Sequence, residues 1–155
     1  MCGIVGGFKD FKEHDNTLIK SALKIMRNRG PNDEGFESYY QANKFRLILG
    51  HTRLSIIDLS SAGHQPMATP DGRFITVFNG EIYNYKEIKK ELKNLGYTFV
   101  SGSDTEVLLA AWKHWGEESL RYIDGMFAFV IFDKKENSLT CVRDAFGIKP
   151  FFYSY

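Results

Sequence analysis

The chain has 155 residues, 43% of them hydrophobic and 25% charged, a balance that suits one globular domain with a buried core. Its 20 basic and 19 acidic residues are mixed along the chain and form no basic run, so neither nucleic acid nor an anionic membrane is expected as a partner. No apolar run reaches the roughly 20 residues of a membrane span, no secretory signal is present, and the two cysteines make no disulfide framework. We therefore expect a cytoplasmic protein with reduced thiols.

The first residues, Met-Cys-Gly, lead into an apolar strand predicted over residues 3–8. Removal of Met1 would give Cys2 both a thiol and a free α-amine. Such an amine has a pKa of about 7.7–8.0, so near neutral pH much of it is a base that can activate the thiol. This pattern favours an N-terminal nucleophile, although an incidental thiol at a chain terminus is the simpler alternative.

Hydrophobic spacing predicts the elements of the first half of the chain. A helix capped by Asp15 or Asn16 carries apolar residues at helical spacing and ends at Gly30-Pro31. The predicted elements that follow are a hairpin of residues 36–40 and 45–49 across 41–44, a strand-like stretch over 50–57, and a loop over 58–71 rich in Ser, Gly and Pro.

The second half is predicted to contain two adjacent helices between strands. Its expected elements are a strand over 73–78, a helix over 85–95 stopped by Gly96, a helix opened by the capping box Ser103 to Glu106 and ending at Gly116, a short helix over 117–123, and strands over 126–132, 139–143 and from 150 onward. Hairpin-length connections favour antiparallel sheets with helices on their outer faces, hence an α+β fold in layers. Because the chain stops within an apolar strand, we expect it to belong to a longer polypeptide.

Three charged residues are candidates for binding a small ligand. Arg53 ends a strand, and its guanidinium can grip a carboxylate through two parallel hydrogen bonds. Asp104 lies in a first helical turn, which we expect to be exposed, and Glu81 follows an Asn-Gly pair. Arg53 and Asp104 have purely structural alternatives, a surface ion pair and a favourable charge near a helix start. Taken together they would bind both ends of a zwitterionic amino acid.

Asn79-Gly80 follows an alternating strand, which most simply predicts a hairpin turn. The same pair can instead present the Asn79 amide and the Gly80 N–H as two donors of an oxyanion hole. The four histidines lie at no metal-ligand spacing, so no metal site is predicted. A pairing of Cys2 with His51 or His64 stays open, and Arg143, Asp144 and Lys149 are most simply a charged turn.

Seven blocks together resemble one family closely. In order they are Met-Cys-Gly-Ile-Val-Gly at 1–6, Arg-Gly-Pro at 29–31, Gly-His-Thr-Arg-Leu-Ser-Ile at 50–56, Gly-His-Gln-Pro-Met at 63–67, Phe-Asn-Gly-Glu-Ile-Tyr-Asn at 78–84, Ser-Gly-Ser-Asp-Thr-Glu at 101–106 and Arg-Asp-Ala-Phe-Gly-Ile-Lys-Pro at 143–150. The chain resembles the glutaminase domain of class II glutamine amidotransferases, of the asparagine synthetase B type. Asn32 and Ala145 depart from the usual family residues.

The resemblance implies a fold and a set of roles. The fold is a four-layer αββα sandwich of antiparallel sheets, the N-terminal-nucleophile hydrolase fold. Cys2 is similar to the family nucleophile, and its α-amine to the general base. Asn79 and Gly80 match the oxyanion hole. The residues matching the glutamine-binding set are Arg53, Leu54, Ile56, Glu81 and Asp104, with Leu54 and Ile56 contributing backbone.

The same resemblance implies partners outside residues 1–155. The family domain continues for a few strands beyond Tyr155, and an ATP-dependent synthetase domain then uses the ammonia. ATP and magnesium are expected only there, and no cofactor is expected in this segment. Asparagine synthesis from aspartate is the favoured reaction; the alternatives are a sugar-acid or other acceptor, or a regulatory module that binds glutamine without turnover. A homodimer is a further option.

Overall fold

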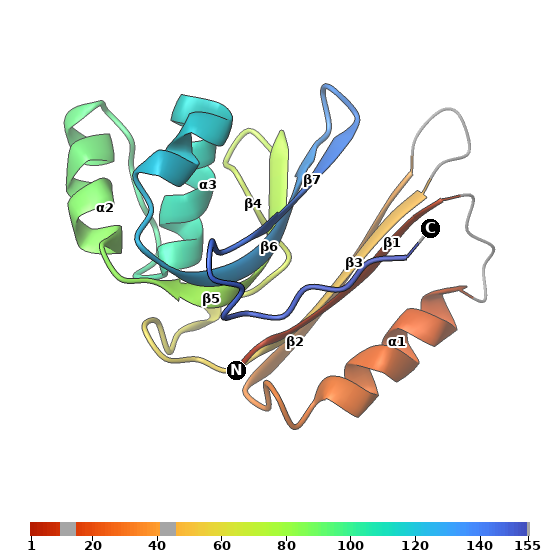
Figure 1. The fold of residues 1–155 in the computed structure, drawn as a ribbon. Helices are drawn as coiled ribbons and strands as arrows, with labels where there is room; N and C mark the ends of the chain where they lie inside the picture. Colours follow the sequence, from red (N-terminus) through yellow and green to blue (C-terminus); the bar gives the residue numbers. More distant parts are fainter. Residues whose placement is uncertain (10–14, 41–45, 155) are drawn as a thin grey trace.

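The computed structural model describes residues 1–9, 15–40 and 46–154, which form four layers (Figure 1). Helix α1 (Asp15–Met26) covers the outer face of one three-stranded sheet, and helices α2 (Tyr85–Asn94) and α3 (Asp104–Trp115) cover the outer face of a second sheet. The two sheets face each other across an apolar interior. This arrangement confirms the predicted αββα sandwich.

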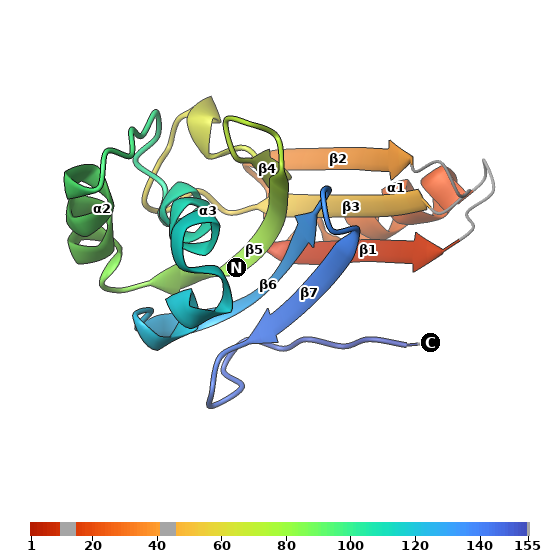
Figure 2. The same ribbon diagram turned by 90° about the horizontal axis from the view of Figure 1, so that it is seen from above.

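Both sheets are antiparallel throughout. Sheet A has the order β1 (Gly3–Lys9), β3 (Arg46–Arg53), β2 (Asp33–Tyr40). Sheet B has the order β4 (Met67–Ala68), β5 (Phe74–Ile82), β6 (Gly125–Asp133), β7 (Ser138–Arg143). Short helical turns η1 (Ser61–Gly63) and η2 (Gly116–Arg121) lie in the connections. Figure 2 shows β5, β6 and β7 crossing over the strands of sheet A.

Strand alternation sorts the apolar side chains into separate layers of core. Between the sheets pack Ile4, Leu47, Leu49, Ile75, Val77, Val130 and Phe132. Residues of the opposite parity pack outward: Ile48 lies against Leu23 of α1, and Phe78 and Phe129 lie against α2 and α3. Strand β6 is therefore covered on both faces, as its continuous apolar run predicts.

Most predicted helix ends are confirmed. Gly96 and Gly116 take positive φ angles of 91° and 59° just past α2 and α3, a conformation that favours glycine. The Ser103 hydroxyl caps α3 by accepting a hydrogen bond from Thr105 N at 3.1 Å. The predicted capping box is only half formed, because the Glu106 carboxylate binds the N–H groups of residues 100 and 101 instead.

The hairpin turn predicted at Asn79-Gly80 is wrong. Strand β5 runs straight through this pair to Ile82, because β6 pairs with it residue by residue as far as Gly125. Gly80 is needed for close packing rather than for a turn: a Cβ there would overlap the Met126 carbonyl.

Three other predicted elements differ from the structure. The strand predicted through residue 57 ends at Arg53, and the predicted loop over 58–71 contains η1 and the short strand β4. Residues 150–154 lie along the outside of β1 in Figure 2 but pair with no strand in the described part of the chain, so the final predicted strand is wrong there. The predicted turn at 41–44 lies outside the described residues.

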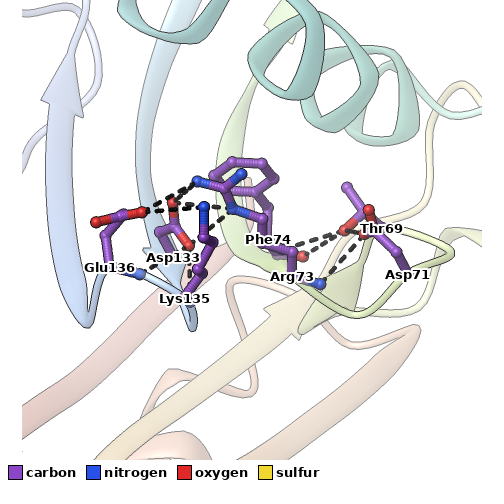
Figure 3. Close-up of polar contacts among 7 residues, drawn as sticks. All are labelled: Thr69, Asp71, Arg73, Phe74, Asp133, Lys135 and Glu136. Carbon is purple, nitrogen blue, oxygen red and sulfur yellow. Dashed lines mark hydrogen bonds and ion pairs between the residues drawn. The ribbon is translucent and has the colours of Figure 1, made fainter.

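An ion pair closes the end of sheet B opposite the Asn79-Gly80 end of β5 (Figure 3). Arg73 Nη2 lies 2.6 Å from Asp133 Oδ2, and Arg73 Nε donates to Asp133 Oδ1 at 3.0 Å. The guanidinium also stacks over the Phe74 ring at 4.6 Å from its centre. The ion pair joins Arg73, the residue before β5, to Asp133, the β6 residue that pairs with Phe74.

Among the described residues, no helix is both long enough and apolar enough to cross a membrane.

Candidate active site

A pocket of about 180 Å³ opens between the two sheets at the end where Cys2 lies. It is lined by segments far apart in the sequence: the chain start, the end of β3 and the loop after it, the second half of β5, and the start of α3. Every predicted site residue lines this pocket: Cys2, Arg53, Leu54, Ile56, Asn79, Gly80, Glu81 and Asp104.

The same alternation that builds the core brings these side chains together. Cys2 continues the row of Ile4 on β1, and Arg53 continues the row of Leu47 and Leu49 on β3, so both face sheet B. Asn79 continues the row of Ile75 and Val77 on β5 and faces sheet A. The apolar core between the sheets thus ends in a polar cluster drawn from both of them.

Cys2 is half-buried and held by its neighbours on sheet A. The amide N–H of Leu54 points at Cys2 Sγ across 3.4 Å, and Arg29 Nε donates to the Cys2 carbonyl at 3.2 Å. These two contacts fix the position of Cys2 at the edge of the pocket. Met1, which precedes Cys2, is about half exposed.

Arg53 is 7% exposed, so the alternative of a surface ion pair is wrong. Its guanidinium donates to the carbonyl of Ser60 at 2.7 Å and to that of Asp58. These bonds orient the group toward the pocket and leave other N–H groups for a ligand. Asn32, which departs from the family pattern, supports this corner: its N–H donates to the Arg53 carbonyl at 3.0 Å and its side chain accepts from Ser55 N.

The second half of β5 has one unpaired edge, and this edge faces the pocket. Strand β4 pairs with β5 only up to Thr76, so the N–H groups of residues 78, 80 and 82 point away from any neighbouring strand. Phe78 N donates to Gln65 Oε1 at 2.6 Å, and Ile82 N donates to Asp104 Oδ2 at 3.1 Å. Gly80 lies between them, and its N–H is directed to the same edge, where a ligand would sit.

His51 and Gln65 hold this edge in place, a role that sequence reasoning missed. His51 is 1% exposed and its Nε2 donates to the Phe78 carbonyl at 3.0 Å. Burial lowers the pKa of His51 to about 4, although the bond to Phe78 works in the opposite direction. Gln65 also donates to Thr105 Oγ1 at 3.2 Å and so ties β5 to α3. The sequence signal for Gln65 is its place in Gly-His-Gln-Pro-Met at 63–67, one of the seven segments that resemble the family.

No Cys–His pair forms among the described residues. His51 is engaged with Phe78, and His64 Nδ1 lies 2.7 Å from Asp33 Oδ2. A general base for Cys2 must therefore come from elsewhere.

Asp104 is 6% exposed, so the expectation of an exposed carboxylate at the start of α3 is wrong. Burial raises its pKa to about 6, an effect reduced by the backbone N–H groups it accepts from and increased slightly by the charge of Glu81. Two acidic groups side by side in a small pocket favour binding of a cation such as an α-ammonium.

A comparison with solved structures identifies the fold. The structure is similar, with a TM-score of 0.77, to the glutamine phosphoribosylpyrophosphate amidotransferase from B. subtilis complexed with ADP and GMP, covering 96% of this chain and 38% of that chain. At 21% identity this likeness shows the fold alone, and it is the predicted N-terminal-nucleophile fold.

The sequence then places the chain within a family. The model of the glutamine amidotransferase domain matches residues 1–155, and the chain belongs to this family. It is 42% identical to "Asparagine synthetase [glutamine-hydrolyzing] 1" of Bacillus subtilis and 40% identical to "Putative asparagine synthetase [glutamine-hydrolyzing] 2" of Methanocaldococcus jannaschii, over 99% of this chain in each case. The chain spans only 24% and 32% of the length of these two relatives.

Proposed function

We propose that this chain hydrolyses glutamine to glutamate and ammonia, with Cys2 as the nucleophile. The observation that carries the proposal is the convergence of Cys2, the open edge at Gly80 and the charges of Arg53 and Asp104 on one pocket. Membership of the glutamine amidotransferase family supports the same substrate.

The two ends of the amino acid are bound by opposite charges. Arg53 fixes the α-carboxylate, and Glu81 with Asp104 fixes the α-ammonium. The backbone at Leu54 and Ile56 lines the space between these groups and Cys2. This arrangement favours a free amino acid over a residue within a peptide, because only a free amino acid carries both the α-carboxylate and the α-ammonium.

The chemistry then follows from the groups around sulfur. After Met1 is removed, the Cys2 α-amine takes the thiol proton and the thiolate attacks the side-chain amide carbon. The Asn79 side-chain amide and the Gly80 N–H stabilise the oxyanion; loss of one such donor is expected to lower kcat by about 10²–10³-fold. The ammonium returns its proton to the departing nitrogen, which leaves as ammonia. Water attacks the γ-glutamyl thioester, giving glutamate and the free thiol.

The direct test is glutamate and ammonia release by a preparation whose intact mass shows the loss of Met1. Cys2→Ala is expected to abolish release, and Cys141→Ala, at the exposed second thiol, is expected to retain it. Full activity in Cys2→Ala would contradict the mechanism.

One observation favours a second function while Met1 is attached. Met1 lines the pocket, and its peptide bond to the Cys2 nitrogen leaves no free α-amine at Cys2 to act as base. In that form the chain is proposed to bind glutamine without turnover. Calorimetry on the Met1-retaining form distinguishes the two functions, because binding without ammonia release supports this one.

We further propose that the ammonia passes to an ATP- and magnesium-dependent synthetase domain of a longer polypeptide in the cytoplasm, for asparagine synthesis from aspartate. Support comes from the names and greater length of the relatives. A sugar acid or another carboxylate is the alternative acceptor. Supplying candidate acceptors with ATP to the full-length protein, and identifying the amide formed, tests this step.

A further inference from the structure

The turn that follows β7 is built around one buried carboxylate. Asp144 is 6% exposed and accepts hydrogen bonds from the N–H groups of Phe127, Ile148 and Lys149 at 3.2, 2.8 and 2.9 Å. Arg143 Nε donates to the Lys149 carbonyl at 2.7 Å. These bonds fix the backbone of Lys149 beside β6 at Phe127, the residue that pairs with Gly80.

The Lys149 side chain is held inside the pocket rather than in solvent. It is 6% exposed and lines the same cavity as Cys2, which corrects the expectation of a simple charged surface turn. Its Nζ donates to Met1 Sδ at 3.5 Å. Across residues 1–9, 15–40 and 46–154 this is the one partner of the ammonium, and a thioether is a weak acceptor.

A buried cation without a carboxylate is costly, so its position requires a reason. The partner it has, Met1, is the residue whose removal the proposed chemistry requires. Cys2 and Lys149 line the same pocket, so once Met1 leaves, the new α-amine of Cys2 opens into the cavity that holds the ammonium. A fixed positive charge there opposes protonation of the amine.

We propose that Lys149 acts on catalysis through the base of this pocket: its ammonium keeps the α-amine of Cys2 in its neutral, proton-accepting form. This inference rests on the proposed function, since it names the group that tunes the proposed base.

Other charged groups near the N-terminus also affect protonation of the amine, and their effects must be distinguished from that of Lys149. Arg29 contacts the Cys2 carbonyl and acts in the same direction as Lys149. Arg53, Asp58, Glu81 and Asp104 also line the pocket. Asp58, Glu81 and Asp104 are the opposing charges, because the neutral N–H groups that donate to Asp58 and Asp104 do not cancel the negative charge of these carboxylates.

The experiment measures the amine itself, in protein whose mass confirms loss of Met1. The rate of acetylation of the N-terminal amine is followed across its titration range, about pH 6 to 9, by mass spectrometry of the N-terminal peptide. Wild type is compared with Lys149→Met, Lys149→Arg, Arg29→Met and the denatured chain. Lys90→Met, on the exposed face of α2, is the matched control.

Lys149→Met is expected to raise the midpoint of amine titration by roughly one pH unit, whereas Lys149→Arg and Lys90→Met leave it unchanged. The acid limb of kcat/KM for glutamine is expected to move with it. An unchanged midpoint in Lys149→Met overturns the inference. If that variant does not fold, a wild-type amine that titrates no lower than that of the denatured chain overturns the inference instead, and a lower midpoint that persists in Arg29→Met supports it.

The amine titration does not require turnover, so the two proposals fail separately. If the protein releases no ammonia but its amine midpoint depends on Lys149, only the proposed glutamine hydrolysis is contradicted. If the protein hydrolyses glutamine but its amine midpoint does not change in Lys149→Met, only the proposed role of Lys149 is contradicted.

Discussion

His51 Nε2 donates a hydrogen bond to the carbonyl oxygen of Phe78 across 3.0 Å, and this bond links the two sheets at the pocket. His51 stands on β3 beside the nucleophile strand, and Phe78 directly precedes Asn79 on β5. Because a carbonyl only accepts, Nε2 carries the hydrogen and the neutral ring leaves Nδ1 unprotonated. The spacing between Cys2 and the proposed oxyanion donors therefore depends on one buried imidazole.

Replacing His51 is expected to change how stability depends on pH. The pKa of about 4 in the fold lies below the ordinary 6.5, so the unfolded chain binds the proton more tightly. His51 therefore adds stability at neutral pH that is lost as pH falls from 6.5 toward 4, up to about 3 kcal/mol. Asp104 titrates with the opposite sign in an overlapping range, so the comparison must be made between variants.

The measurement is urea unfolding of wild type and His51→Gln at several pH values. Glutamine keeps an N–H donor for Phe78 but has no proton to gain, so its free energy of unfolding is expected to fall less steeply below pH 6.5. Equal slopes in the two proteins would contradict the assigned pKa of His51.

Gln65 is expected to support turnover without touching substrate chemistry. Gln65→Met leaves the buried Phe78 N–H without an acceptor, at a cost of about 1–3 kcal/mol in the free energy of unfolding. Because this segment carries Gly80, kcat is expected to fall more than KM rises. Thr105→Val removes only the other hydrogen bond of Gln65 and is expected to affect kcat less. A larger kcat effect in Thr105→Val would argue against the edge of β5 as the sensitive element.

The order of elements and the layering could be predicted from the sequence because they depend on local spacing. The helical spacing before Met26 and the apolar run in β6 fix which faces are buried, and glycine marks the ends of α2 and α3. The candidate residues were found because each carries chemistry in its own right or matches a family block.

What could not be predicted depends on contacts between distant segments. Asn79-Gly80 has the local signature of a turn, and only pairing with β6 keeps it extended. Asp104 and Lys149 look exposed in sequence because their burial comes from elements more than 20 residues away, such as β5 for Asp104 and Met1 for Lys149. The site is formed between two sheets, and the sequence of any single strand does not show which side chains meet there.

Gly63 is expected to control glutamine affinity through Arg53. A methyl group at this position would overlap the Arg53 guanidinium, which is buried and cannot easily move aside. Gly63→Ala is therefore expected to raise KM for glutamine about tenfold or more, since a binding contact of roughly 1.4 kcal/mol or more is displaced, with a smaller effect on kcat. Steady-state kinetics against Ser61→Ala, an exposed position in the same turn, provide the comparison. An unchanged KM would remove Arg53 from carboxylate binding.

Asp104 is expected to make glutamine binding depend on pH. With a pKa of about 6, the carboxyl group loses its charge as pH falls through that value, so KM of the wild type is expected to rise below about pH 6 while kcat changes less. Asp104→Asn keeps an acceptor for Ile82 N but has no charge. Its KM is expected to be about 10–100-fold higher at neutral pH, the loss typical of a charged hydrogen bond, and flat across this range.

The same substitution is expected to stabilise the unliganded fold. A carboxyl group whose pKa is raised on folding contributes stability below its unfolded value of 3.8, and that contribution is lost as pH rises through about 6. At neutral pH the wild type therefore holds a charge that burial disfavours, and Asp104→Asn removes it. Thermal unfolding at pH 7 is expected to give a higher Tm for Asp104→Asn than for wild type, with Glu91→Gln on exposed α2 as the control. A lower Tm together with an unchanged KM would mean that Asp104 serves only to hold Ile82.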